Sequence, residues 1–87
     1  MKLLAVEITV LYFAAVRDLA GTAREQLTLP GAVRSVAELQ AHLERVRPEL
    51  AGRLGQVRFA RNEAFADASE ALEPGDVVAL IPPVAGG

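Results

Sequence analysis

The sequence predicts a small α+β domain, in which a mixed sheet of four to five strands packs against one main helix. Strand-like segments lie toward both ends of the chain, and one amphipathic helix is expected between them. The length favours the same class, because 87 residues form one domain with a modest core. We expect the domain to span residues 1–81 and an extended tail to span residues 82–87.

The chain is expected to begin with a strand, a short helix and a second strand. The segment EITVLYF (Glu7–Phe13) is rich in β-branched and aromatic residues, which are typical of strands. AAVRDLAG (Ala14–Gly21) predicts a short helical turn that ends at its glycine. REQLTLP (Arg24–Pro30) alternates weakly and ends at a proline, so it predicts a second strand paired with the first.

The main helix is predicted over Ser35–Arg47. Ser35 and Glu38 have the spacing of a capping box, and Pro48 limits the helix at its other end. The apolar residues of this segment fall on one helical face and predict the side that packs on the sheet: Val36, Leu39, Leu43 and Val46. His42 lies beside this face and is interpreted as a boundary or surface histidine.

The last third of the chain predicts three more strand segments. QVRFARN (Gln56–Asn62) alternates apolar and basic residues, as a strand with one wet face does. A turn at Asn62-Glu63 leads to a short piece around Phe65, and Glu73–Asp76 contains a proline–glycine turn. VVALIP (Val77–Pro82) is apolar on both faces, which predicts a central strand. This order of elements is the plan of a β-grasp domain.

The first and last strands have apolar residues on both of their faces. Alternation places Ile8, Val10, Tyr12, Val78 and Leu80 toward the helix. It leaves Thr9, Leu11, Phe13, Val77, Ala79 and Ile81 on the outer face. Because this outer face is unusually apolar for a solvated surface, we expect it to be an interface.

Composition and spacing exclude most kinds of active site. The chain has no cysteine, which fits a cytoplasmic protein and rules out thiol chemistry, and no residues have the spacing of a metal site. Ser35 is expected to be a cap, and Ser69 has no base near it in sequence. Gly52 and Gly55 are too sparse for a phosphate loop. We therefore expect no stand-alone enzyme and no bound cofactor.

Charge and hydropathy indicate which partners to expect. All nine basic residues lie at or before Arg61, and five acidic residues follow it. The acidic segment makes nucleic acid an improbable partner and predicts either a solvated acidic rim or a surface that steers a basic partner. The longest uncharged run near the start, Ile8–Val16, is too short to cross a bilayer.

The segment IPPVAGG at the end of the sequence predicts a projecting thread. Pro82 and Pro83 favour an extended backbone, and the six residues from Pro82 to Gly87 reach roughly 20 Å when extended. Val84 and Ala85 are small, and the glycines have no side chain, so the thread fits a narrow channel. A frayed end or an expression scar is the alternative interpretation of the two glycines.

The segments LYFAAVRDLAG (Leu11–Gly21) and LEPGDVVALIPPVAGG (Leu72–Gly87), with the helix between them, resemble the ubiquitin-like sulfur carriers, most closely the small subunits of molybdopterin synthase. The resemblance implies that a ubiquitin-activating-type adenylating enzyme uses ATP to activate the Gly87 carboxylate. A sulfur donor then converts it to a thiocarboxylate. The large synthase subunit, in a heterotetramer with the carrier, transfers this sulfur to a cyclic pyranopterin precursor.

The resemblance also assigns roles to residues of this sequence. Gly86 and Gly87 carry the chemistry, and an apolar patch beside the tail engages both partners. The binding positions that match the family are Phe13, Phe65, Ile81, Pro82, Pro83, Val84 and Ala85. Other functions stay open: a carrier for thiazole or thio-tRNA synthesis, a protein modifier that forms isopeptide bonds, or a β-grasp binding module without C-terminal chemistry.

Overall fold

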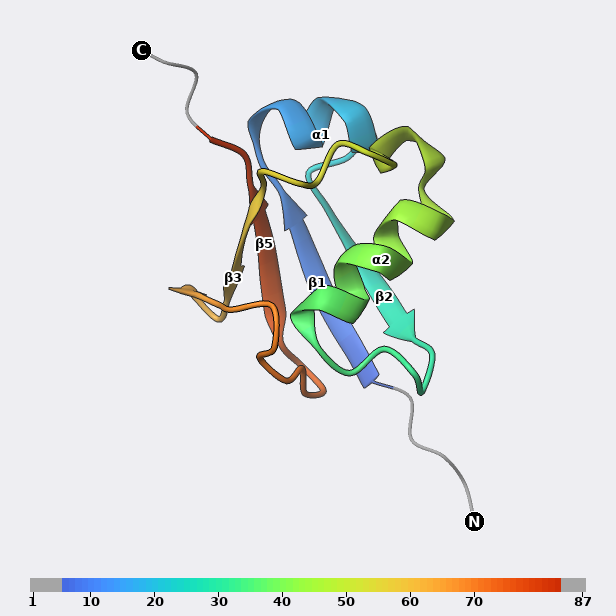
Figure 1. The fold of residues 1–87 in the computed structure, drawn as a ribbon, viewed down its shortest axis with the longest axis vertical. Helices are drawn as coiled ribbons and strands as arrows, with labels where there is room; N and C mark the ends of the chain where they lie inside the picture. Colours follow the sequence, from blue (N-terminus) through green and yellow to red (C-terminus); the bar gives the residue numbers. More distant parts are fainter. Residues whose placement is uncertain (1–5, 84–87) are drawn as a thin grey trace.

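The computed structural model describes residues 6–83 and shows a mixed five-stranded sheet with its helices on one side (Figure 1). In chain order the elements are β1 (Val6–Tyr12), α1 (Ala14–Ala20), β2 (Arg24–Leu29), α2 (Val36–Val46), the 3-10 helix η1 (Pro48–Leu50), β3 (Arg58–Arg61), β4 (Ala64–Phe65) and β5 (Val77–Ile81). This is the predicted β-grasp arrangement, with η1 as the one element that was not predicted. Among the described residues, no helix is long and apolar enough to span a membrane.

The strands are ordered β2-β1-β5-β3-β4 across the sheet. β1 and β5 form a parallel pair in which Thr9 is opposite Val77 and Tyr12 is opposite Leu80. The other neighbouring pairs are antiparallel. β5 therefore has a hydrogen-bonded strand on each side, which confirms that the apolar segment near the C-terminus is a central strand.

The core lies between the sheet and α2. The inward positions predicted for β1 and β5 are all buried: Ile8, Val10, Tyr12, Val78 and Leu80. Leu39 and Leu43 of α2 have no exposed surface, as predicted. The helix begins at Ser35, whose Oγ accepts a hydrogen bond from the Glu38 backbone N–H at 3.3 Å. The Glu38 side chain accepts from the Arg34 N–H at 2.7 Å, one residue before the cap.

Two residues of α2 differ from their predicted environment. Val46 was expected in the core but is 49% exposed, whereas His42 is buried, with 8% exposure. The chain leaves the helix immediately after Val46, and the next core positions are filled by Leu50 and Leu54, both without exposed surface. The core is thus completed by the segment after the helix, and the last helical turn does not need an apolar face.

β3 is shorter than predicted, and its burial does not alternate. It spans Arg58–Arg61, and the adjacent residues Phe59 and Ala60 are both buried. Phe59 faces the core, while Ala60 is on the outer face between its strand partners Phe65 and Ala79. The alanine is small enough for these neighbours to cover, so the outer face of β3 is less exposed to solvent at this position than its sequence predicted.

Turns with left-handed backbone conformations connect the elements. α1 ends at Gly21, whose φ is 78° and whose N–H donates to the Arg17 carbonyl at 2.9 Å. Gly75 has a φ of 86° in the turn before β5. Asn62 and Glu63, between β3 and β4, also have positive φ, at 51° and 73°. The predicted turns therefore lie where the sequence placed them.

A partly buried glutamate connects β1, β2 and the end of α2. Glu25 Oε1 accepts hydrogen bonds from the Tyr12 hydroxyl and from Arg47 Nε, each at 2.6 Å. The hydrogen bond from Arg47 holds the pKa of Glu25 below its usual range, against the opposing effect of burial. Burial and the hydrogen bond to Glu25 raise the pKa of Tyr12. These contacts fix the end of α2 on the sheet.

Candidate functional site

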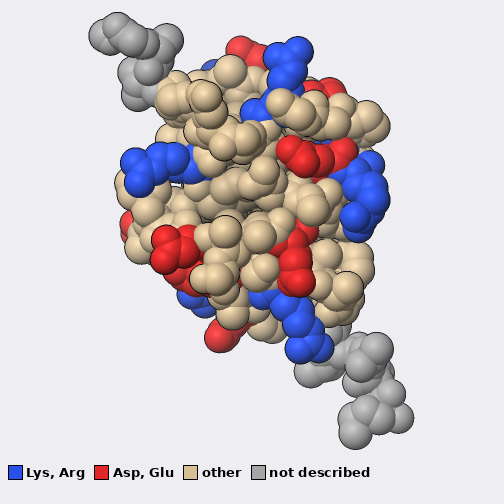
Figure 2. Space-filling model, viewed as in Figure 1, with Lys and Arg blue, Asp and Glu red and all other residues tan. Residues whose placement is uncertain are grey.

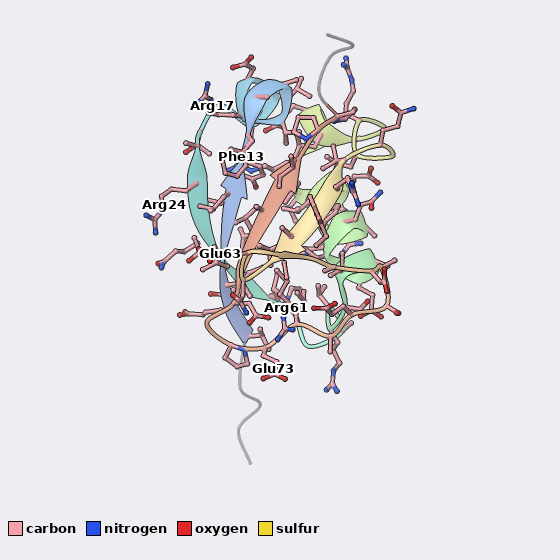
Figure 3. All side chains as sticks on the ribbon, turned by 90° about the vertical axis from the view of Figure 1, so that its left-hand side faces the viewer. Phe13, Arg17, Arg24, Arg61, Glu63 and Glu73 are labelled. Atoms are coloured by element: carbon pink, nitrogen blue, oxygen red, sulfur yellow. The ribbon has the colours of Figure 1, made fainter. Side chains whose placement is uncertain are left out.

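The outer face of the sheet, opposite α2, contains a broad apolar hollow of about 610 Å³. Residues from β1, β3, β4 and β5, from the junction of β1 and α1 and from the turn between β3 and β4 line it: Leu11, Phe13, Ala60, Asn62, Glu63, Phe65, Val77, Ala79 and Ile81. We call this surface the outer hollow. Figure 3 looks onto this side of the sheet, with α2 behind it.

The outer hollow follows directly from strand alternation. Leu11 lies between the buried residues Val10 and Tyr12, and its parallel partner in β5 is Ala79. Phe13 and Phe65, with 45% and 60% exposure, are among the most exposed large apolar residues of the described chain. The three predicted patch residues, Phe13, Phe65 and Ile81, therefore share one face. That they contact a partner stays a prediction.

The buried carboxylate of Asp76 lies next to residues that line one end of the outer hollow. Asp76 Oδ2 accepts hydrogen bonds from Arg61 Nε at 2.6 Å and from the Glu73 N–H at 2.8 Å, and its Oδ1 accepts from Asn62 Nδ2 at 3.0 Å. Asn62 Oδ1 in turn accepts from the Val77 N–H at 2.9 Å. The β3–β4 turn and the start of β5 are thereby joined.

The hydrogen bonds to Asp76 stabilise its carboxylate in the charged form although the residue is buried. Burial opposes the charged form, but the hydrogen bonds from Arg61, the Glu73 N–H and Asn62 outweigh it and lower the pKa of Asp76. The same arginine pairs with Glu70 at 3.1 Å. The prediction of a wholly solvated acidic rim is therefore wrong for Asp76, because its fixed partners compensate for its desolvation.

Charges of both signs surround the outer hollow. In Figure 3, Phe13 and Arg17 lie toward one end of the sheet and Glu63 and Glu73 toward the other. In the view of Figure 2, basic and acidic residues are interspersed with other residues, and no single-sign field covers that surface. The apolar lining distinguishes the outer hollow itself.

The chain leaves the sheet beside the outer hollow. β5 ends at Ile81, a hollow-lining residue, and is followed by the half-buried Pro82 and the exposed Pro83. Both prolines also line a second groove of about 400 Å³ between α1 and the loop of residues 52–57. The predicted tail residues Val84 and Ala85, and the predicted chemical residues Gly86 and Gly87, lie outside the described residues.

The remaining candidate residues do not form a catalytic group. His42 is buried, so its predicted boundary or surface position was wrong; its Nδ1 lies 3.5 Å from Arg45 Nη2. Burial and the charge of Arg45 lower the pKa of His42. Within residues 6–83, no group of three or more histidine, aspartate or glutamate residues could hold a metal ion. The outer hollow and the adjacent chain exit are thus the candidate site.

A parallel β1–β5 pair at the centre of a mixed sheet, with α2 across one face, defines a ubiquitin-like β-grasp protein. A model described as the ThiS family matches residues 10–87. The chain belongs to the ThiS family.

Curated relatives cover nearly the whole chain. A molybdopterin synthase sulfur carrier subunit from Mycobacterium tuberculosis is 37% identical, over 94% of this chain and 99% of the relative. The protein of the same name from Homo sapiens is 31% identical, over 93% of this chain and 94% of the relative.

Solved structures share the fold and nearly the full length. A putative molybdopterin converting factor, subunit 1, from Pyrococcus furiosus has a TM-score of 0.81 and 30% identity, covering 91% of this chain and 99% of that chain. Small archaeal modifier protein 1 from Haloferax volcanii has a TM-score of 0.80 and 25% identity, with coverage of 91% and 99%. A chain in the complex of subunits 1 and 2 of molybdopterin-converting factor from Helicobacter pylori has a TM-score of 0.69 and 26% identity, with coverage of 94% and 100%.

Proposed function

We propose that this chain is the sulfur carrier subunit of a molybdopterin synthase and that it carries sulfur as a thiocarboxylate on Gly87. The observation that carries the proposal is the family match, which extends through Gly86-Gly87, together with relatives named as such subunits. The structure supplies a suitable support, because the central strand β5 leads from the core to Pro82-Pro83 beside the outer hollow.

The proposed chemistry requires activation by another protein. A terminal carboxylate, with a pKa of about 3.5, is ionised at neutral pH and is a poor electrophile. ATP would convert it to an acyl-adenylate with release of pyrophosphate, and a sulfur donor would displace AMP to leave the thiocarboxylate. ATP would be bound by the adenylating enzyme, and this chain would carry the acyl group. The sulfur would then pass to a cyclic pyranopterin precursor.

Two partners are part of the proposal. The first is the large synthase subunit, which is supported by the similarity to a chain in the complex of subunits 1 and 2 from Helicobacter pylori. The second is a ubiquitin-activating-type adenylating enzyme. Phe13, Phe65 and Ile81 would provide the apolar contact for both, with the tail entering the active site of each. A heterotetramer with the large subunit is the proposed assembly in the cytoplasm.

A protein-modifier function is the second candidate, because small archaeal modifier protein 1 has the same fold at 25% identity. Carriers for thiazole or thio-tRNA synthesis would share the same activation. The acceptor separates these functions: a lysine side chain for a modifier, and a small molecule or tRNA for a carrier. The named relatives favour the molybdopterin carrier.

Intact mass spectrometry tests the proposal directly. The purified chain, incubated with its adenylating enzyme, ATP and a sulfur source, should gain about 16 Da, the difference between sulfur and oxygen. The sulfurated chain should then support molybdopterin synthesis with the large subunit. A matched variant with one alanine appended after Gly87 should fold normally but should not support molybdopterin synthesis. Full molybdopterin synthesis by that variant, with its extra residue confirmed by mass, would overturn the proposal.

A further inference from the structure

Arg58 lies close to the chain exit and lines a groove beside the outer hollow, with which that groove shares Phe65. It is the first residue of β3, and its strand partner is Ile81, the last residue of β5. Its guanidinium carbon lies 4.2 Å from the centroid of the Phe65 ring, which is a cation–π contact. The charge is thus held against an aromatic residue that lines the outer hollow.

Arg61, the other arginine of β3, is engaged differently, because it donates to Asp76 and Glu70. Within residues 6–83, Arg58 pairs with no carboxylate, and its side chain is exposed. A guanidinium that stacks through its face keeps its N–H donors at its edges, where they are available to a carboxylate in the same plane.

Docking of a protein on the outer hollow changes the environment of this charge. The apolar lining requires an apolar counter-surface, which would remove water from Phe65 and from the guanidinium stacked on it. Desolvation of a charged group without a partner is costly, whereas a bidentate carboxylate satisfies it with two charge-assisted hydrogen bonds. A complementary partner therefore combines an apolar surface with an aspartate or glutamate that faces the N–H groups of Arg58.

We infer that Arg58 is a specificity-determining residue of the docking face and that it pairs with a carboxylate of the large synthase subunit. This inference rests on the proposed function for the identity of the partner. The contact with Phe65 holds the guanidinium beside the outer hollow before binding. Arg58 thereby selects a partner with a carboxylate in register with the apolar contact, and it adds a charge contact to the hydrophobic one.

The test is binding of the large subunit, measured by titration calorimetry over a range of salt concentrations. Arg58→Met keeps an unbranched stem over Phe65 but removes the charge and the donors. We expect it to raise the Kd about 10- to 100-fold and to flatten the salt dependence. Arg58→Lys should keep the salt dependence and bind several-fold less tightly, because it loses the planar fork. Arg45→Met is the matched control, since it removes the same charge from α2, on the opposite side of the sheet.

The salt dependence separates an ion pair from simple support of Phe65. If Arg58 only orients the ring, Arg58→Met weakens binding with an unchanged salt dependence, and the inference is overturned. Wild-type affinity in Arg58→Met overturns it as well. Failure of the proposed function is distinguishable, because the wild-type chain would then neither bind the large subunit nor gain the mass of sulfur. Thermal unfolding of each free variant should match that of the wild-type chain within a few degrees.

Discussion

Replacing Phe13 with aspartate should separate docking from folding. Phe13 is the N-cap of α1, and its side chain makes no capping hydrogen bond. Full burial of a phenylalanine side chain stabilises by about 1.5–3 kcal/mol, and a side chain only half covered should contribute about 0.8–1.5 kcal/mol. Aspartate is among the preferred N-cap residues and should recover about 1 kcal/mol by accepting from a first-turn N–H. The net change in unfolding free energy should therefore stay within about 1 kcal/mol.

The same substitution should have a large effect on binding. It places a carboxylate in the outer hollow, where docking would desolvate it without a built-in partner. We expect the Kd for the large subunit to rise by at least about 100-fold, which corresponds to about 2.7 kcal/mol. Urea unfolding of the free chain and calorimetric titration of the large subunit measure the two effects independently.

Val46→Asp is the matched control for Phe13→Asp. Val46 is about as exposed as Phe13 but belongs to α2, on the opposite side of the sheet from the outer hollow. The control adds the same negative charge and should leave the Kd within about twofold, because it changes no docking contact. Unchanged binding in Phe13→Asp would refute the docking face. A loss of stability above about 3 kcal/mol would instead place Phe13 in the core.

Other substitutions test the core, the Glu25–Arg47 contact and the tail. Leu43→Ala should cost about 2–5 kcal/mol in urea unfolding, while Val46→Ala should cost less than about 1 kcal/mol; equal losses would contradict the observed burial. The Arg47 hydrogen bond lowers the pKa of Glu25 below its ordinary 4.5, so the stability from this carboxylate is present above that pH and is lost as the pH falls through the lower, folded-state pKa. Glu25→Gln should therefore destabilise the chain more at pH 7 than at pH 3, and a pH-independent difference would refute this reasoning. Gly86→Val should leave unfolding unchanged and block thiocarboxylate formation or sulfur transfer, so wild-type turnover would exclude a narrow channel.

Local sequence patterns predicted the fold because most of its strands and helix ends are determined by residues close together in the sequence. The alternation in β1 and β5 sorts inner from outer residues without knowledge of the partner strands. Ser35 and Gly21 mark a helix start and a helix end through backbone requirements that depend on few neighbours. The same alternation placed Phe13 and Ile81 on the outer face, so most of the outer hollow could be predicted as well.

Features that depend on tertiary proximity could not be predicted from these patterns. Glu25 and Arg47 are separated by 22 residues, and only the docking of α2 on the sheet brings them within hydrogen-bonding distance. The helical stripe included Val46 because periodicity does not reveal where the chain turns to supply Leu50. In the sequence, Arg58 is one basic residue of an alternating strand segment. Its contact with Phe65 requires the β3–β4 turn to bring the strands together.

The position of β5 has a mechanical consequence for a carrier. Its ladders to β1 and β3 hold both edges of the strand that leads to the tail, and the Phe13 N–H donates to the Leu80 carbonyl at 3.3 Å. An edge strand would have one ladder and could peel away when a partner binds the tail, whereas β5 can separate only if both ladders break together. Because Leu80 is buried and Ile81 lines the outer hollow, the strand that anchors the chain exit also contributes to docking. Under the proposed function, a partner seated on the outer hollow would therefore meet the chain exit at a fixed point beside its docking contacts, which favours a positioned reaction.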